Sequence, residues 1–136
     1  MDCIFCKIGK KEIESYIVSE TENFLAFLDI HPLTPGHTII IPKMHIIDFF
    51  DLDENFGNEF VKIIKETINK IKNGLGVKDF TIGINEGKLA GRAIDHLHLH
   101  IIPRYKGDNG GSLHRIVHYK TDENLESIYK KIKNAS

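Results

Sequence analysis

Three histidines stand at alternate positions in one short run of the chain, His96, His98 and His100, with leucines between them. In an extended strand, residues two apart point to the same face of the sheet. The three imidazoles can therefore converge on one ligand or serve two adjacent sites. Imidazole is the commonest metal ligand, and it also suits nucleophilic attack and proton transfer near neutral pH. The run predicts a metal site or a catalytic site rather than an exposed polar face.

The only cysteines, Cys3 and Cys6, form a Cys-x-x-Cys pair near the start of the chain. Two cysteines are too few for the disulfide scaffold of a secreted domain. In a reducing compartment this spacing is compatible with a metal site, a redox pair or two plain thiols. The first residues also lack a basic stretch followed by an apolar one, so we expect no secretory signal and a cytoplasmic protein.

The elements that must position these residues are predicted from the apolar pattern and from glycine and proline. Short strands are expected over residues 15–19, 24–30, 37–41, 79–85 and 96–102. Pro42 and Pro103 are expected to close two of these strands, because proline donates no hydrogen bond to a ladder.

The segment 53–73 is the best helix, since its apolar residues recur at three- and four-residue steps. Asp51 or Asp53 can cap its start, and Gly74 stands where a helix commonly ends. A terminal helix is predicted over 122–133. Consecutive strands around one long helix predict an α+β fold with a mainly antiparallel sheet of about five strands.

Composition limits the class of protein. The chain has 136 residues, the size of one ordinary domain, and 41% of them are hydrophobic. Lys plus Arg number 18 and Asp plus Glu 19, which gives a net charge of −1. This balance argues against a nucleic-acid or membrane-surface partner. No apolar run approaches the roughly 18 residues that a membrane span needs.

The histidine run resembles the signature of the histidine triad (HIT) family, His-φ-His-φ-His-φ-φ, in which φ is apolar. Four further segments are similar to that family, residues 27–30, 36–45, 85–91 and 103–105. The likeness extends over 3–106 and is to the Hint-like branch, in particular its zinc-containing prokaryotic members. It implies a HIT-like fold with a short N-terminal helix. A single HIT domain would then span 1–136, with a C-terminal loop and helix over 107–136.

The resemblance implies a nucleotide hydrolase or nucleotidyl transferase that acts on a purine nucleotide, such as a phosphoramidate or a dinucleoside polyphosphate. The middle histidine, His98, would attack the α-phosphate and form a covalent nucleotidyl-histidine. Water or another acceptor would then release the nucleoside monophosphate. Covalent catalysis of this kind splits one difficult displacement into two easier ones. In the family, a backbone carbonyl near the first histidine, here His96, holds the proton on the second nitrogen of the nucleophile.

Other residues take their roles from the same resemblance. His37 and His100 would contact phosphate oxygens, and Asn85 would lie on the phosphate side. Gly91 would let a loop pass close to the phosphate, where a Cβ would obstruct it. Asp29 would accept hydrogen bonds from the ribose hydroxyls. Four apolar residues would line the base pocket, with plain core packing as the alternative: Phe5, Ile8, Phe27 and Ile30.

The zinc-containing members of the family hold their metal with two cysteines and two histidines, and four residues here match that set: Cys3, Cys6, His45 and His96. Two thiolates and two imidazoles make a closed tetrahedral site of the structural kind. The resemblance therefore implies one structural zinc ion per chain. The alternative is a pair of reduced thiols.

The chain departs from the family directly after Gly91. Relatives commonly carry glutamine there, followed by serine or threonine, whereas this chain has Arg92 and Ala93. A hydroxyl at the second position can help to protonate an amine leaving group, and Ala93 has none. Arg92 offers a fork of donors for extra phosphates, so we expect a preference for polyphosphate leaving groups. Alternatively, Arg92 points to solvent or to a neighbouring acid.

Two other functions compete with this interpretation. The strand histidines could hold a catalytic metal in a metal-dependent hydrolase. The chain could also be a nucleotide-binding regulatory protein with little turnover. The Hint-like branch pairs through sheet extension and the long helix, so the resemblance also implies a homodimer.

Overall fold

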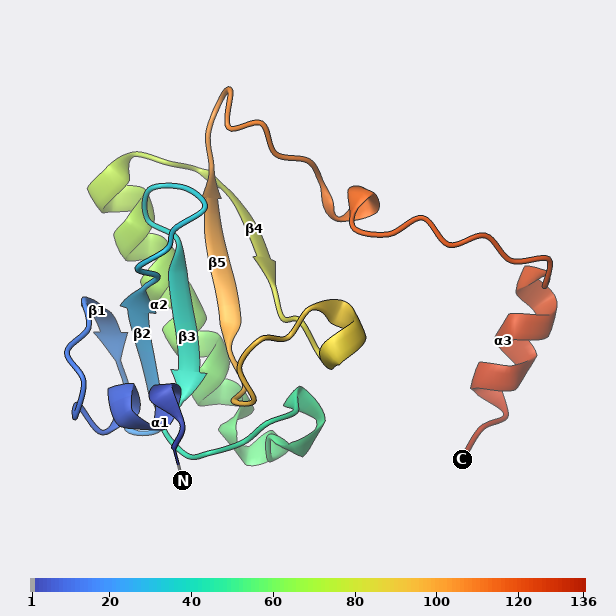
Figure 1. Ribbon diagram of the computed structural model, residues 1–136, viewed down its shortest axis with the longest axis horizontal. Helices are drawn as coiled ribbons and strands as arrows, with labels where there is room; N and C mark the ends of the chain where they lie inside the picture. The colour runs from blue at the N-terminus through green and yellow to red at the C-terminus, as the bar shows by residue number, and fades with distance from the viewer. Residues whose placement is uncertain (1) are drawn as a thin grey trace.

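The computed structural model describes residues 2–136 and contains one sheet, three α-helices and short 3₁₀ turns. The helices are α1 (Ile4–Gly9), α2 (Gly57–Leu75) and α3 (Leu125–Lys133). The strands are β1 (Ile17–Glu20), β2 (Phe24–Leu28), β3 (Thr38–Pro42), β4 (Asp79–Gly83) and β5 (Leu99–Arg104). All neighbouring strands are antiparallel, in the order β1-β2-β3-β5-β4. This arrangement confirms the predicted α+β class (Figure 1).

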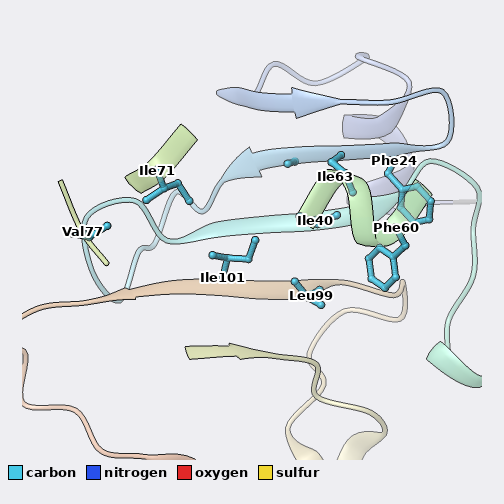
Figure 2. Close-up of a cluster of buried hydrophobic side chains, with 9 residues drawn as sticks. Phe24, Ile40, Phe60, Ile63, Ile71, Val77, Leu99 and Ile101 are labelled. Carbon is cyan, nitrogen blue, oxygen red and sulfur yellow. The ribbon is translucent and has the colours of Figure 1, made fainter. Parts of the chain in front are cut away.

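The main core lies between α2 and one face of the sheet (Figure 2). Ile63 of α2 is fully buried there, among residues such as Ile40 and Ile101 of the sheet. Each such side chain contributes about 1.5–3 kcal/mol when it leaves water. A second apolar cluster, around Leu25 and Ile41, includes residues of α1. Because β2 and β3 are covered on both faces, their sequences are continuously apolar rather than alternating.

The long helix differs from its predicted limits at the C-terminal end. Asp53 caps a 3₁₀ turn that leads into α2, and its side chain accepts a hydrogen bond from the N–H of Asn55. The prediction that Gly74 ends the helix was wrong, because Gly74 lies inside it. The residue in the left-handed conformation that terminates α2 is Gly76, with φ 71°.

Strand β5 differs from prediction at both ends. It begins at Leu99, so His96 and His98 lie in the turn that leads into it. Pro103 does not end the strand but lies within it, opposite Phe80. The carbonyl of Pro103 accepts a hydrogen bond from Thr34 Oγ1 at 2.7 Å, on the side where pairing with β3 stops at Ile101. The missing N–H of this proline therefore costs no ladder bond.

The segment after β5 leaves the body of the molecule and ends in α3, which stands apart from the sheet (Figure 1). The predicted terminal helix is present, but its apolar residues are exposed, Leu125 by 84% and Ile132 by 71%. Within residues 2–136, none of the helices combines the length and apolar character needed to span a bilayer.

Candidate active site

The histidines gather where the turn into β5 meets the two ends of β3. His100 lies on β5 opposite Ile39 of β3, and His37 directly precedes β3. His37, His96 and His98 are all buried. The alternate histidines divide between two groups, because His96 lies against the cysteines while His98 and His100 lie next to one another, with ring centroids 5.1 Å apart.

One ring nitrogen of His98, Nδ1, makes a hydrogen bond, whereas the structure gives none for Nε2 among the residues that it describes. Its Nδ1 lies 2.7 Å from the main-chain oxygen of His96. A carbonyl can only accept, so Nδ1 carries the proton and donates it to this bond. The lone pair is then on Nε2. The edge of the Phe5 ring packs against the imidazole at 5.1 Å between centroids. This tautomer is the one that a neutral imidazole nucleophile requires.

His37 and His100 form a hydrogen-bonded pair with a defined direction. The N–H of Leu33 donates to Nδ1 of His37 at 3.1 Å, so the proton of His37 is on Nε2. That Nε2–H donates to Nδ1 of His100 at 2.9 Å, which leaves the His100 proton on its own Nε2. Burial lowers the pKa of His37, and burial together with His98 and His37 lowers the pKa of His100 to about 4. Both rings are therefore neutral donors at neutral pH.

Asp29 follows β2 and lies beside this pair. Its Oδ1 accepts a hydrogen bond from the N–H of His31 at 2.8 Å, and its Oδ2 is 3.7 Å from Nε2 of His37. Asp29, His37 and His100 are close enough to hold a metal ion by donor type. However, a metal on Nε2 of His37 would displace the proton that the Leu33 bond fixes there. The hydrogen bonds thus favour a donor pair over a metal site.

The other residues predicted for the nucleotide site differ from one another in how exposed they are. Asn85 lies two residues beyond β4 and is exposed. Gly91 has φ 97°, and a Cβ built on it would meet no protein atom within 4 Å. Its surroundings within the protein are therefore open. Among the apolar residues, three are buried in the second core cluster, namely Phe5, Ile8 and Phe27. Ile30, by contrast, is 74% exposed.

The Cys/His cluster consists of Cys3, Cys6, His45 and His96, whose ligand atoms all lie within 4.8 Å of one another. Nδ1 of His96 is 3.4 Å from Sγ of Cys3, and Nδ1 of His45 is 3.2 Å from Sγ of Cys6. Tetrahedral zinc, with Zn–S of about 2.3 Å and Zn–N of about 2.0 Å, would separate sulfur and nitrogen by about 3.5 Å.

The protonation of His96 also suits a metal ligand. Its Nε2 lies 2.8 Å from the carbonyl of Pro42 and therefore carries the proton, which leaves Nδ1 free to coordinate. Burial, followed by Cys3, raises the pKa of Cys6 in the metal-free chain. A bound cation would oppose that effect, because it stabilises the thiolate. The donor set and its spacing fit zinc.

Arg92 lies among three carboxylates, and its side chain is only 11% exposed. Its Nη1 donates to Asp48 Oδ1 at 2.6 Å. The same atom is 3.9 Å from Glu86, and Nε is 3.3 Å from Asp95. The hydrogen bond to Asp48 raises the pKa of Arg92 above its ordinary value. The guanidinium is thus partnered by neighbouring acids.

Three features of the site were not predicted from the sequence. Glu86 stands inside a recognised motif, yet its carboxylate binds the N–H groups of Phe49 and Phe50, far away in the sequence. The N–H of Leu33 sets the tautomer of His37. It belongs to the main chain, so the type of residue at this position does not indicate the bond. The third is Asp95, which lies beside Arg92. It is the only one of the three that the sequence could have indicated, because it stands three residues after Arg92 and has the opposite charge.

Comparison with known proteins agrees with the fold and the motifs. The family model described as the HIT domain matches residues 10–107. The Uncharacterized HIT-like protein MJ0866 of Methanocaldococcus jannaschii is 40% identical over 131 residues, which is 96% of this chain and 98% of that protein. Adenosine 5′-monophosphoramidase hnt1 of Schizosaccharomyces pombe is 36% identical over 110 residues, covering 81% of this chain and 80% of its own length.

Two crystal structures extend the likeness to three dimensions. A member of the HIT family from Bacillus subtilis superimposes with a TM-score of 0.84 at 33% identity, over 100% of this chain and 99% of that one. A zinc-bound histidine triad family protein from Mycobacterium smegmatis gives a TM-score of 0.72 at 33% identity, over 93% and 88% of the two chains. With the family model covering most of its length, this chain belongs to the histidine triad family.

Proposed function

We propose that the protein is a nucleotide hydrolase or nucleotidyl transferase that works through a covalent nucleotidyl-His98 intermediate. The observation that carries this proposal is the bond from Nδ1 of His98 to the carbonyl of His96, at 2.7 Å. In the neutral ring this bond fixes the proton on Nδ1 and places the lone pair on Nε2, the atom that would attack phosphorus. The yeast relative named as an adenosine 5′-monophosphoramidase supports chemistry at a purine nucleotide phosphate.

The reaction takes place in two displacements. Nε2 of His98 donates its lone pair to the α-phosphorus, and the bond from phosphorus to the leaving group breaks with its electron pair on that group. Water then attacks the same phosphorus, the P–Nε2 bond breaks with its electron pair on Nε2, and the nucleoside monophosphate leaves as the water gives up a proton to solvent, which restores the neutral imidazole. The Nε2–H of His100 is the donor that stabilises charge on the phosphate oxygens. His37 keeps that donor in place through its 2.9 Å hydrogen bond.

The substrate would be held by the residues around this centre. Asp29 would bind the ribose hydroxyls with its carboxylate, which is 18% exposed. Asn85 and Gly91 would lie toward the phosphates, as the family pattern implies. The purine base would rest against four apolar residues at the N-terminal side of the site, Phe5, Ile8, Phe27 and Ile30.

We propose that the Cys3, Cys6, His45 and His96 cluster holds one structural zinc ion. A zinc ion there supplies no chemistry to the phosphate and joins the N-terminal segment to the turn that carries His98. The spacing of the donors supports this, as does the zinc-bound relative from Mycobacterium smegmatis. The site has four protein ligands and no open position, which is typical of structural rather than catalytic zinc.

We propose further that two copies of the chain form a homodimer. Strand β4 is an edge strand with one free side. Two large apolar residues near that edge and on α2, Ile82 and Val61, are 41% and 52% exposed. Light scattering on the purified protein tests this, since a single mass near 15.5 kDa would contradict it.

The stereochemistry at phosphorus tests the covalent route. With a substrate chiral at its α-phosphorus, two successive displacements retain configuration. A single attack by water, as in a metal-dependent hydrolase, inverts it. We expect retention, and a His98→Ala variant that releases no product. Inversion would overturn the proposal, and binding of nucleoside monophosphate without turnover would favour a regulatory protein.

A further inference from the structure

Two segments of the chain, residues 42–48 and 92–98, are fastened to one another at several points. The N–H of Leu97 donates to the carbonyl of Ile46 at 2.6 Å. His96 donates to the carbonyl of Pro42 at 2.8 Å, and its ring lies beside His45. These bonds lie at one end of the contact, next to the Cys/His cluster, and they hold the turn from which His98 projects.

Arg92 closes the other end of the same contact. Its Nη1 donates to Asp48 Oδ1 at 2.6 Å and lies 3.4 Å from the carbonyl of Ile47. The guanidinium is well buried, while the carboxylates of Asp48 and Asp95 are 47% and 63% exposed. The charged centre is therefore inside the contact, and the acids surround it from the solvent side.

Glu86 ties a third segment to the same place. One carboxylate oxygen accepts from the N–H of Phe49 at 3.0 Å, the other from the N–H of Phe50 at 3.3 Å. The first of these oxygens is also 3.9 Å from Nη1 of Arg92. Without the guanidinium, Asp48, Glu86 and Asp95 would repel one another across this contact. The cation is what allows the three acidic segments to meet.

From these contacts we infer that Arg92 is a positioning residue, which sets the place of His98 by clamping the loop 86–95 onto residues 46–50. The path is short and continuous. Arg92 holds the start of the segment, Leu97 and His96 hold its end, and the carbonyl of His96 holds Nδ1 of His98. The inference rests on the proposed function, because it assigns Arg92 a role in the attack by His98. Nη1 of Arg92 is already engaged by Asp48, and Nε is buried beside Asp95 without a hydrogen bond within residues 2–136, so the guanidinium is poorly placed to serve a substrate phosphate.

Arg92→Gln is the central variant, with adenosine phosphoramidate and diadenosine tetraphosphate as the two substrates. We expect kcat to fall about ten- to hundred-fold for both, since a displacement of about 1 Å in a reacting group costs up to a hundred-fold. We expect KM to change little, and the ratio of the two kcat/KM values to stay within about two-fold. Arg92→Lys should recover part of the rate, because it keeps the charge but lacks the planar fork.

Arg104→Gln is the matched control. Arg104 also donates to a neighbouring carboxylate, Asp108, at 2.8 Å, but it stands at the far end of β5 from the turn that carries His98. Both glutamine variants lose an ion pair, so a general loss of stability would slow both enzymes alike. Should Arg92→Gln fail to fold, Asp48→Asn weakens the same clamp from its exposed side, with the same expected fall in kcat.

Two results would overturn the inference. One is an unchanged kcat in Arg92→Gln, or in Asp48→Asn if that variant has to replace it. The other is a loss confined to diadenosine tetraphosphate and expressed in KM, which would mean that Arg92 contacts phosphate directly. If the wild type itself formed no adenylate adduct, the proposed function would fail. An adduct in the wild type, with no effect of the variant, would refute only the role of Arg92.

Discussion

Nδ1 of His98 lies 2.7 Å from the carbonyl oxygen of His96, two residues earlier in the chain. This bond links the two clusters of the site, since the imidazole of the same His96 belongs to the Cys/His set. A change at the cluster is therefore transmitted to His98 through one residue.

Loss of the metal should weaken the fold without abolishing the chemistry. Cys6→Ser should reduce bound zinc from one ion per chain to none and lower Tm by roughly 5–15 °C, which corresponds to a loss of about 2 kcal/mol or more. His98 should still accept an adenylate, at a reduced rate. Metal analysis, calorimetry and single-turnover kinetics measure the three effects. Complete loss of turnover with an intact fold would instead support a metal-dependent hydrolase.

Stability should fall as the solution becomes acidic, in part because of His100. The pKa of this residue is lowered from 6.5 to about 4 in the folded chain, so the unfolded chain takes up its proton first. The stabilisation is complete above about pH 6.5 and is lost as the pH falls toward 4. The contribution is at most about 3 kcal/mol, because the ring is only partly buried and solvent screens part of the effect.

Urea unfolding of the wild type and of His100→Asn between pH 7.5 and 4 measures this effect. The difference between the two proteins should shrink by about that amount as the pH falls. His114→Asn, which replaces an exposed histidine in the segment after β5, should behave like the wild type. A difference that stays constant with pH would show that the charge state of His100 does not affect folding.

The contribution of Asp29 to substrate binding should depend on the ribose hydroxyls. Asp29→Asn should reduce kcat/KM about ten- to hundred-fold, since a hydrogen bond to a charged group contributes about 1.5–3 kcal/mol. A substrate without ribose hydroxyls should lose a similar factor on the wild type and almost nothing more on the variant. Full additivity of the two losses would mean that Asp29 does not contact the ribose.

Packing of α2 against the sheet should determine much of the stability of the fold. Ile63 is fully buried beneath the sheet, whereas Val61 on the same helix is 52% exposed. Ile63→Ala should cost about 2–5 kcal/mol of unfolding free energy. Val61→Ala should change it by less than about 0.5 kcal/mol in the monomer. Chemical denaturation distinguishes them, and equal losses would contradict the packing described here.

Much of the fold could be predicted because its pattern is local. The apolar stripe of α2 and the continuously apolar strands β2 and β3 identify themselves in the sequence. The limits of β5 could not be predicted, since Pro103 is tolerated only because pairing with β3 has already ended beside it. That fact depends on the register of two strands distant in sequence.

The site divides in the same way. The family motif identified the histidines and cysteines as candidate site residues, and the structure places them in two clusters. A neighbouring acid beside Arg92 was one of the expected alternatives, but Asp48 and Glu86 could not be identified as its partners, because they approach it from other segments. Nor could the direction of the hydrogen bond between His37 and His100 be predicted, since a main-chain N–H of Leu33 decides it.

The measurement that tests the central claim most directly is the intact mass of the denatured protein after brief exposure to an adenylylated substrate. We expect the wild type to gain one adenylate in an acid-labile adduct that survives denaturation. His98→Ala should gain none, whereas His114→Asn should behave like the wild type. An adduct of equal yield on His98→Ala, or hydrolysis by the wild type with no adduct at any time, would contradict nucleophilic catalysis by His98.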